Sequence, residues 1–541
     1  MAYIGAFLGG PDAQIPAGSC GVSLCVNSTD RQNLSTASWT ITAEGYTKTV
    51  NADSSGRAYV EIPAGPKYTI ELNHYGFYEN DGPQTIETES KMRYGVYFDL
   101  FTYPPINTVL KVTTEPLETV TISNGENFQS LTADSSGIVE FKGLPTDSTW
   151  TVSAGGQEKD VTISALVTEI KVGVFPIYGV RIKISESDPE AACEYTDDAV
   201  GIAPASGHNL NGWKGTALFE EIKPVVLTSG PKKTYLNLTD LTKTIAGAAS
   251  NIASVGNDAM TEFPIWYTYI NNDGEYVTIK YCKKQKAGFL AYAHTQAGQL
   301  QTHFYVGCFL GYNSSSMLYS TSGVTPTASV SITNFIAYAK ARGTGYDIFT
   351  WFQCMYIVGL VLLAYKTRDL QEHLRGYVDG SAAQTNTATT FDNNYGIAGS
   401  TSGTTRMAFL WIWDLWGNLR QFLGRAKTNS SCKLMVIIDG YSSVTESDFE
   451  AVDTTISTNN SGYITQVEGG PKSGFFPKVF SGSSTTFWCD YGFVYASYFP
   501  TFGGYWGIAD RAGPFCVTFS SSAADPDSYI GSRLSYCLGV A

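Results

Sequence analysis

Short runs of alternating apolar and polar residues fill the chain from residue 20 to about residue 175, for example at 36–45, 58–65 and 67–73. Gly, Pro, Asn and Asp separate these runs at turn spacing. Successive side chains of a strand point to opposite faces of a sheet, so this alternation is typical of strands with one buried face. The sequence therefore predicts an N-terminal part that is β throughout.

An internal repeat divides this part in two. The segment 51–61 (NADSSGRAYVE) matches 132–141 (TADSSGIVEF), about 80 residues later. In each copy a strand enters an Asp-Ser-Ser-Gly turn, a second strand leaves it, and a proline turn at Pro63 or Pro145 precedes a closing strand. A period of this length fits small β-sandwich modules that each close their own core.

We predict two sandwich modules, residues 20–102 and 103–176, which meet at the turn Tyr103-Pro104-Pro105 and follow an attachment segment at 1–19. They resemble the immunoglobulin-like and prealbumin-like spacer modules of cell-surface and phage tail proteins. Calcium is an alternative role for the Asp-Ser-Ser-Gly turns, but a single Asp per loop favours a plain turn.

Two helices are predicted near the middle of the chain. Residues 331–342 have the spacing of an amphipathic helix, with one apolar stripe made of Ile332, Phe335, Ile336 and Ala339. Residues 347–365 are apolar all round and, at ~1.5 Å per residue, almost long enough to cross a ~30 Å hydrocarbon layer, so a membrane span is one interpretation. Thr350 and Gln353 inside the stretch, and the amphipathic helix before it, favour the buried centre of a large domain.

Composition narrows the class of protein. A chain of 541 residues has room for two to four domains, and 43% hydrophobic residues are enough for sizeable cores. Charged residues make up only 16%, a profile closer to extracellular or virion β-proteins than to a cytosolic metabolic enzyme. The net charge of -14, without a Lys/Arg run, disfavours nucleic acid as a partner.

The first 18 residues contain no basic segment and no apolar run of secretory-signal length, so we expect a protein that is made in a cytoplasm and is not exported by the ordinary route. Ten cysteines are scattered from Cys20 to Cys537 without a CxxC pair. They indicate neither a zinc site nor a disulfide framework, and buried thiols are expected.

An ordered set of motifs follows in the C-terminal part: Phe304-Tyr305-Val306-Gly307, Gly311-Tyr312, 320–326 (STSGVTP), 335–346 (FIAYAKARGTGY), Trp416-Gly417-Asn418, 502–506 (FGGYW), Ala512-Gly513-Pro514-Phe515 and 530–534 (IGSRL). In these motifs the chain resembles phage tail and tail-fibre proteins that end in a C-type lectin-like domain. That domain is related in fold to formylglycine-generating enzymes and occurs in variable proteins of diversity-generating retroelements. The resemblance covers 300–541 well and 177–300 loosely, and does not reach the N-terminal modules.

The resemblance implies a fold and a function. The expected fold is multidomain, with two N-terminal all-β immunoglobulin-like sandwiches followed by an α+β C-type lectin-like domain over 177–541. The family binds a receptor, glycan or protein, on the bacterial host through loops that correspond to about 488–522, where retroelements diversify some members. Other phage tail proteins are expected partners, a homotrimer is the expected assembly, and the location is the virion, after synthesis in the host cytoplasm. No cofactor, metal or membrane span is expected.

The composition of 488–522 points to binding without help from the family. Aromatic residues alternate there with Ser, Thr, Gly and Asp, which is typical of binding surfaces built from rigid rings and adaptable polar groups. About half of the aromatics are expected in the core, first of all Trp488, Phe502 and Trp506. The predicted receptor-binding residues are Asp490, Tyr491, Phe493, Tyr495, Ser497, Tyr498, Phe499, Thr501, Tyr505, Ile508, Asp510, Arg511 and Phe515. The predicted scaffold residues are Trp416, Gly417, Asn418, Gly503, Gly504, Trp506, Gly513, Pro514, Gly531 and Arg533.

Three alternatives remain open. A redox or copper site would use the cysteines of the last third, Cys489, Cys516 and Cys537, although no histidine follows residue 373. A glycan-cleaving tail enzyme would need two converging carboxylates, for which the chain offers Asp490, Asp510, Asp525 and Asp527. The third alternative is a bacterial surface adhesin with the same domain. A signal peptide would favour this alternative. We favour a binding protein over an enzyme.

Overall fold

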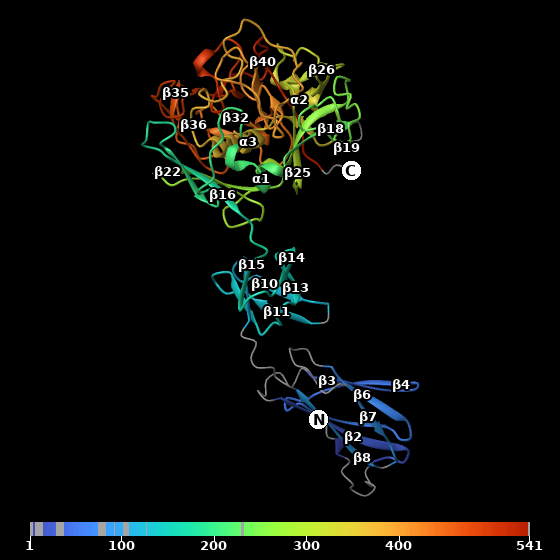
Figure 1. Cartoon of the computed structure of the whole chain (residues 1–541). Coiled ribbons are helices and arrows are strands. Elements are labelled where there is room, and N and C mark those ends of the chain that lie inside the picture. The colour runs from blue at the N-terminus through green and yellow to red at the C-terminus, as the bar shows by residue number, and fades with distance from the viewer. Residues whose placement is uncertain are drawn as a thin grey trace. The chain divides into compact units, whose positions relative to one another are not determined.

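The computed structural model describes residues 4–5, 15–28, 37–73, 83–90, 92–100, 108–125, 127–228 and 232–538 (Figure 1). Most of the predicted attachment segment 1–19 and the predicted junction Tyr103-Pro104-Pro105 lie outside the described residues. The chain divides into two compact units, Met1–Val174 and Phe175–Ala541. The sequence predicted the start of the C-terminal domain two residues later, at residue 177.

In the residues that the structure describes, the N-terminal unit is built of β-strands, which form two sets. The first set is β1 (Ile4–Gly5), β2 (Ser19–Ser28), β3 (Ser38–Ala43), β4 (Tyr46–Asn51), β5 (Arg57–Pro63), β6 (Lys67–Asn73), β7 (Gln84–Glu87) and β8 (Arg93–Leu100). The second set is β9 (Val109–Thr113), β10 (Thr119–Ser123), β11 (Phe128–Thr132), β12 (Ile138–Lys142), β13 (Thr149–Ala154), β14 (Gln157–Thr162) and β15 (Val167–Lys171).

The two sets share one topology. In the first, β2 pairs antiparallel with β5 and parallel with β8, while β4, β3, β6 and β7 form the second sheet. In the second, β9 pairs antiparallel with β12 and parallel with β15, opposite a sheet of β11, β10, β13 and β14. Each set closes its own core around a fully buried tryptophan, Trp39 or Trp150. The repeat in the sequence therefore corresponds to a repeat of topology.

The Asp-Ser-Ser-Gly turns are also alike. Asp53 Oδ1 accepts from the backbone N–H groups of Ser55 and Arg57 at 2.8 and 3.0 Å. Asp134 Oδ1 accepts from the corresponding groups two and four residues on, at 2.8 and 2.9 Å. Gly56 adopts a φ of 73°, which glycine reaches without strain. Each carboxylate thus organises its own turn.

The C-terminal unit contains three larger sheets. A four-stranded sheet is made of β17 (Cys193–Asp197), β16 (Ile177–Lys183), β22 (Tyr276–Cys282) and β21 (Tyr267–Asn272). A six-stranded sheet is made of β19 (Lys232–Tyr235), β18 (Lys223–Thr228), β20 (Asp258–Pro264), β25 (His303–Gly307), β41 (Leu534–Tyr536) and β28 (Tyr346–Ile348). A seven-stranded sheet is made of β36 (Pro477–Phe480), β35 (Asn460–Val467), β37 (Tyr491–Val494), β39 (Val517–Ser521), β38 (Phe499–Phe502), β31 (Arg420–Phe422) and β40 (Ile530–Gly531).

Smaller elements complete this unit. The short strands are β23 (Thr295–Gln296), β24 (Gln299–Leu300), β26 (Tyr312–Ser314), β27 (Met317–Tyr319), β29 (Ala408–Phe409), β30 (Ile412–Trp413), β32 (Ala426–Thr428), β33 (Leu434–Val436) and β34 (Glu450–Ala451). The α-helices are α1 (Ala217–Glu220), α2 (Ile332–Lys340) and α3 (Trp351–Tyr365). The predicted stripe of α2 is buried, and Ser331 caps the helix by accepting from the N–H of Asn334.

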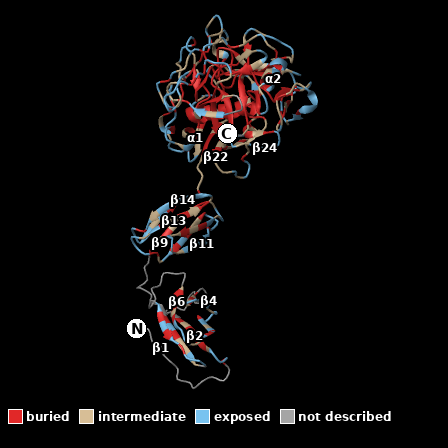
Figure 2. Cartoon of the chain, turned by 90° about the vertical axis from the view of Figure 1, so that its right-hand side faces the viewer, coloured by how far each residue is buried: buried red, intermediate tan, exposed pale blue. Residues whose placement is uncertain are grey.

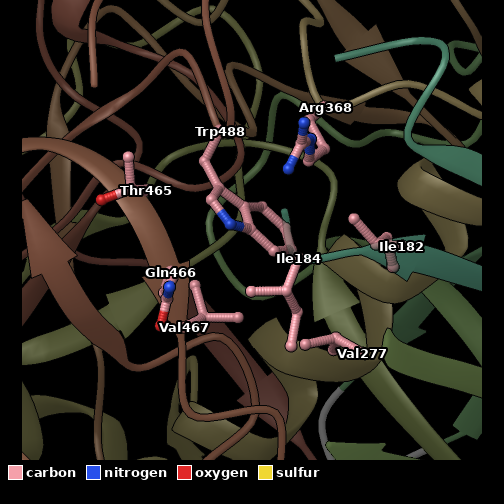
Figure 3. A pocket seen from close by; sticks show the side chains of 8 residues that line it. All are labelled: Ile182, Ile184, Val277, Arg368, Thr465, Gln466, Val467 and Trp488. Carbon is pink, nitrogen blue, oxygen red and sulfur yellow. The ribbon is translucent and has the colours of Figure 1, made fainter. Parts of the chain in front are cut away.

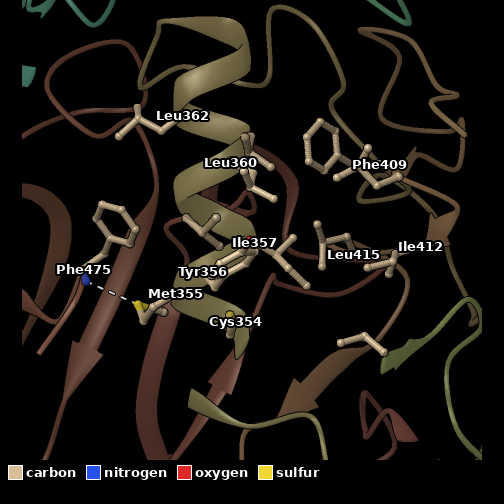
Figure 4. Close-up of a cluster of buried hydrophobic side chains, with 14 of the residues drawn as sticks. Cys354, Met355, Tyr356, Ile357, Leu360, Leu362, Phe409, Ile412, Leu415 and Phe475 are labelled. Atoms are coloured by element: carbon tan, nitrogen blue, oxygen red, sulfur yellow. Dashed lines mark hydrogen bonds between the residues drawn. The ribbon is translucent and has the colours of Figure 1, made fainter. Parts of the chain in front are cut away.

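The apolar stretch predicted over 347–365 becomes a shorter helix. Thr350 and Gln353 form a capping box, so α3 begins at Trp351. The residues before it, Tyr346–Ile348, pair with the C-terminal strand β41 instead. All residues of α3 are buried, and Figure 4 shows its side chains meeting Phe409, Ile412 and Phe475. In the described part of the chain no helix has the length and apolarity for crossing a membrane.

Two apolar clusters fill the C-terminal unit, whose interior is largely buried in Figure 2. The main core surrounds α3 and includes Phe502, Val517 and Phe519 from one face of the seven-stranded sheet. The second cluster includes Phe335 of α2 together with Phe422 from that sheet. The seven-stranded sheet therefore contacts a different cluster on each face.

Candidate binding face

The seven-stranded sheet places aromatic residues on an uncovered surface. On β37, Tyr491 and Phe493 are half-buried, while the alternate residues Gly492 and Val494 are buried. In the register, Tyr463 of β35 lies opposite Tyr491. Directly paired residues share a face of a sheet, so these rings lie together on the side away from the main core.

Five half-buried rings form a continuous row, which we call the aromatic row: Tyr463, Tyr491, Phe493, Tyr495 and Tyr498. Their successive centroids are separated by 5.2, 5.0, 5.9 and 6.5 Å. These are the distances of favourable tilted and edge-to-face contacts. Each ring supports the next one, which keeps the row rigid while part of every ring stays accessible.

A charged pair lies at one end of the row. The Arg511 guanidinium carbon is 4.8 Å from the centroid of Tyr491. Burial, followed by a hydrogen bond to Asp510, raises the pKa of Tyr463. The loop that carries Asp510 and Arg511 is thereby attached to the sheet, and Gln371 Nε2 donates to its Asp510 carbonyl at 2.8 Å.

The same face of the sheet is covered farther along. Phe493 lies opposite Thr518, and Thr518 lies opposite Thr501. The two threonine hydroxyls are buried and 2.6 Å apart. Beyond them Phe422 contacts Phe335 of α2, with centroids 6.3 Å apart. Helix α2 and its cluster thus cover one part of the face and leave the aromatic row open.

Four residues predicted to bind the receptor are buried, and the prediction is wrong for them. Thr501 lies under the α2 cluster, and Phe499 packs against Phe449 in that cluster. Phe515 packs between Phe475 and Trp488. The fourth, the Asp490 carboxylate, is also enclosed. Thr501 and Phe499 lie where the α2 cluster covers the sheet, and Phe515 and Asp490 lie in buried loop segments next to the strands.

Asp490 is a buried acid at the base of the loops. Its Oδ2 accepts from the backbone N–H of Phe515 at 2.7 Å. Burial raises the pKa of Asp490 well above its usual range, and the nearby carboxyl of Asp369 adds to the effect. A Cβ on Gly513 would lie 2.3 Å from Asp490 Oδ1, so only glycine allows this approach.

A second aromatic group surrounds Arg420. Tyr505 stacks on Tyr529 at 4.5 Å and meets Trp506 edge-on at 5.6 Å. The Arg420 guanidinium lies 5.1 Å from the Tyr505 centroid and 5.6 Å from that of Tyr529. Trp506, predicted in the core, is half-buried, as is Ile508. Ser497 is exposed on a turn with a φ of 66°.

The residues predicted as scaffold, Trp506 apart, are buried. Arg533 is fully enclosed: its Nε donates to Gln421 Oε1 at 2.7 Å, and its Nη atoms donate to the carbonyls of Gly307, Trp413 and Asp414. Asn418 Nδ2 donates to Asp414 Oδ2 at 2.9 Å. Gly417, Gly503 and Gly504 have φ values of 77°, 89° and 75°. The buried group also includes Trp416, Gly513, Pro514 and Gly531.

A small cavity of about 10 Å³ lies behind these loops and is lined by residues that include Trp488 and Arg368 (Figure 3). Arg368 is 1% exposed, and its Nη2 donates to the carbonyls of Glu186 and Asp188 at 2.7 and 3.1 Å. Its guanidinium lies 5.8 Å from the Trp488 ring. A space of this size holds about one water molecule. The cavity connects β16 and β22 to the loop that leads into the aromatic row.

The cysteines and acids considered for catalysis have the following surroundings. No disulfide joins any of the ten cysteines, all of which lie in the described part of the chain, and Cys537 Sγ faces the carbonyls of Ala293 and His303. Burial raises the pKa of Cys489 and raises that of Cys516 to about 12, which keeps both as thiols. Asp525 Oδ2 accepts from Ser522 N in its own turn at 2.7 Å, and a hydrogen bond to Asp527 raises the pKa of Tyr529 to about 12. Among the residues that the structure describes, no group of three or more His, Cys, Asp or Glu is arranged to hold a metal ion.

No protein-family model and no curated protein matches the chain. Among solved structures, the chain is similar to the shaft pilin SpaA from Lactobacillus rhamnosus GG, at 13% identity and a TM-score of 0.21, over 29% of this chain and 98% of that chain. A streptococcal ancillary pilin matches at 12% identity and a TM-score of 0.20, over 29% of this chain and 63% of that chain. The Bacillus anthracis TIE protein matches at 13% identity and a TM-score of 0.16, over 54% of this chain and 44% of that chain. Scores this low assign the chain neither to a family nor to a function.

Proposed function

We propose that the chain is a phage tail receptor-binding protein whose C-terminal unit recognises a bacterial surface receptor through the aromatic row, by binding and without catalysis. The observation that carries this proposal is the row itself, five contacting rings of which Tyr463, Tyr491 and Phe493 lie on the open part of the seven-stranded sheet. The other two rings, Tyr495 and Tyr498, lie on the turn between β37 and β38, where Tyr498 also packs against the main core. The resemblance of the ordered motifs to those of phage tail proteins supports the other parts of the proposal, which are the location in a phage tail and a C-type lectin-like fold.

The row has the physical properties of a binding surface. Tyrosine and phenylalanine offer large rigid areas at low entropic cost, and tyrosine hydroxyls add hydrogen bonds. Arg511 supplies a cation next to Tyr491, and Asp510 supplies an acceptor. Such a surface suits either the ring faces of a glycan or the exposed side chains of a protein receptor, with Phe493 at the centre of the row as its anchor.

The other parts have supporting roles in this proposal. The two N-terminal sandwiches separate the binding unit from the rest of the tail, and the segment 1–19 attaches to other tail proteins. A homotrimer would present three aromatic rows to one cell surface and raise the effective affinity. Exposed positions such as Ser497 and Arg511 are suited to diversification, because they vary without disturbing the buried support.

The test is binding of the labelled full chain to intact cells of a panel of candidate host bacteria. We expect strain-selective binding that Phe493→Ala abolishes or strongly weakens. Phe128→Ala is the matched control, because Phe128 is 60% exposed on β11 of the N-terminal unit. Equal binding by the Phe493→Ala variant and the unmodified chain would refute the aromatic row as the receptor site, and a chain that binds no strain would refute the receptor role.

A further inference from the structure

A second concave surface lies in the C-terminal unit, between helix α1 and the edge of the six-stranded sheet. It is a cleft of about 500 Å³, a common size for small-molecule sites. Its lining residues are Glu220, Glu221, Lys223, Tyr235, Ile245, Glu262, Pro264, Lys283 and His303. In Figure 1 the strands β18 and β19 beside the cleft lie on the opposite side of the unit from β35 and β36. The cleft is therefore separate from the aromatic row.

The floor of the cleft is the buried carboxylate of Glu262. Its Oε1 accepts from Lys233 Nζ at 2.7 Å and from the Tyr305 hydroxyl at 2.8 Å. Its Oε2 accepts from the Tyr235 hydroxyl at 3.0 Å. His303 Nε2 lies 3.8 Å from Oε1, and burial lowers the pKa of His303. This carboxylate is held in one orientation, with its charge compensated by Lys233.

At the rim of the cleft, as on its floor, each glutamate is paired with a lysine. Lys283 Nζ pairs with Glu221 Oε2, which also accepts from Trp266 Nε1 at 3.1 Å. Lys223 Nζ lies 3.7 Å from Glu220 Oε2. The side chains of these four rim residues are 30 to 42% exposed, although Glu220 Oε1 already accepts from the Gly215 N–H and from the Tyr395 hydroxyl. Every carboxylate of the cleft thus has a lysine partner.

We propose that this cleft binds a neutral saccharide. An anionic ligand would meet the three glutamates that line the cleft, a cationic ligand would meet Lys223 and Lys283, and an apolar ligand would remove water from all of them. Sugar hydroxyls donate to the carboxylates and accept from the lysines without a change of charge. The ring of Tyr235, 39% exposed, and the side chain of Ile245, 69% exposed, offer apolar contact to the C–H faces of a sugar ring.

The experiment is ligand-detected NMR and calorimetric titration of the full chain with four trisaccharides. Maltotriose and the trimer of N-acetylglucosamine are neutral, trigalacturonic acid is anionic, and the trimer of glucosamine is cationic. We expect at least one neutral trisaccharide to bind at least fivefold more tightly than both charged ones. Lys283→Met and Tyr235→Ala should each weaken this binding at least tenfold, while the thermal unfolding temperature stays within a few degrees of the unmodified chain.

Phe493→Ala distinguishes the cleft from the aromatic row: saccharide binding that this variant weakens tenfold, while Lys283→Met and Tyr235→Ala leave it unchanged, would place the saccharide on the row and overturn the proposal. Failure of both neutral trisaccharides to bind, or tighter binding of a charged one, would overturn the proposal. So would unchanged affinity in both cleft variants. None of these results affects the receptor role of the aromatic row, which is measured by cell binding.

Discussion

The Arg511 guanidinium lies over the ring of Tyr491, 4.8 Å from its centroid, and connects the loop after β38 to the outer face of β37. A cation over an aromatic face contributes about 0.5–1 kcal/mol at an exposed site. The contact therefore orients the loop more than it stabilises the fold. It also places a positive charge at the end of the aromatic row, so that a bound receptor would contact both the charge and the rings.

Replacing Phe493 with Ala should weaken receptor binding by about 1–3 kcal/mol, because the central ring of the row loses its contact area. The free energy of unfolding should change little, since the ring is half-buried and faces away from the main core. Equilibrium binding to a susceptible strain and urea unfolding measure the two quantities. Tyr505→Ala should behave in the same way, whereas Tyr498→Ala should also lower the free energy of unfolding, because Tyr498 packs against the main core.

Phe499 is the matched contrast, six residues further along the chain. It is 4% exposed and packs against Phe449, so Phe499→Ala should cost about 3–5 kcal/mol of stability. Urea unfolding should show a lower midpoint, and binding per folded molecule should be retained. Equal stability of the Phe493→Ala and Phe499→Ala variants would contradict the assignment of the two rings to opposite environments.

Arg533→Met should destabilise the C-terminal unit by more than about 3 kcal/mol, because it removes the donors that four acceptors share in a dry interior. Arg511→Met removes an arginine from the surface and should change stability by at most about 1 kcal/mol, the contribution of its contact with Tyr491. Urea unfolding of both variants tests the difference. A small effect of Arg533→Met would mean that water replaces the guanidinium among these carbonyls.

Local patterns predicted much of the fold. Alternation and turn residues located the strands of both sandwiches, and the spacing of Ile332 and Phe335 located α2, because these signals depend only on neighbouring residues. The start of α3 was missed by four residues. The residues from Tyr346 to Trp351 are mostly apolar, so the sequence alone suggests that the helix starts before Trp351. Tyr346–Ile348 instead form a strand that pairs with the last strand, and a partner so distant in sequence cannot be predicted from neighbouring residues.

The binding face was predicted only in part for the same reason. Tyr491, Phe493 and Tyr495 were identified from composition, whereas Tyr463 joins them through pairing of β35 with β37. Arg420 and Tyr529 were likewise missed, since they meet Tyr505 from distant segments. The capping box of Thr350 and Gln353, by contrast, is a local sequence motif, and it predicts that α3 starts at Trp351.

Acidification should destabilise the C-terminal unit through His294. The ring is fully buried beside Phe304 and Tyr356, its Nε2 lies 3.2 Å from the Phe263 carbonyl, and burial lowers the pKa of His294 to about 3. The unfolded chain takes up the proton near pH 6.5, so the stability is complete above that pH and is lost as pH falls toward 3.

Between pH 7 and pH 5 the loss from this one group should be about 2 kcal/mol. His294→Gln keeps a donor for the carbonyl but does not titrate. Urea unfolding measures the free energy of unfolding of both proteins at the two pH values. Between pH 7 and pH 5 the variant should lose less of it than the unmodified chain. An unchanged gap would show that His294 is not the titrating group.

Asp490 should have the opposite pH dependence. Burial raises the pKa of Asp490 well above its usual range, so the folded state favours the protonated carboxyl. The stability that this carboxyl contributes is complete below the unfolded pKa of about 4 and is lost as pH rises toward the folded pKa. Asp490→Asn keeps an oxygen that accepts from the Phe515 N–H and removes the ionisation. The variant should match the unmodified chain near pH 4 and become progressively more stable than it toward pH 8. Urea unfolding across this range, with Asp525→Asn as an exposed control, tests the sign, and an Asp490→Asn variant that is less stable by the same amount at every pH would contradict it.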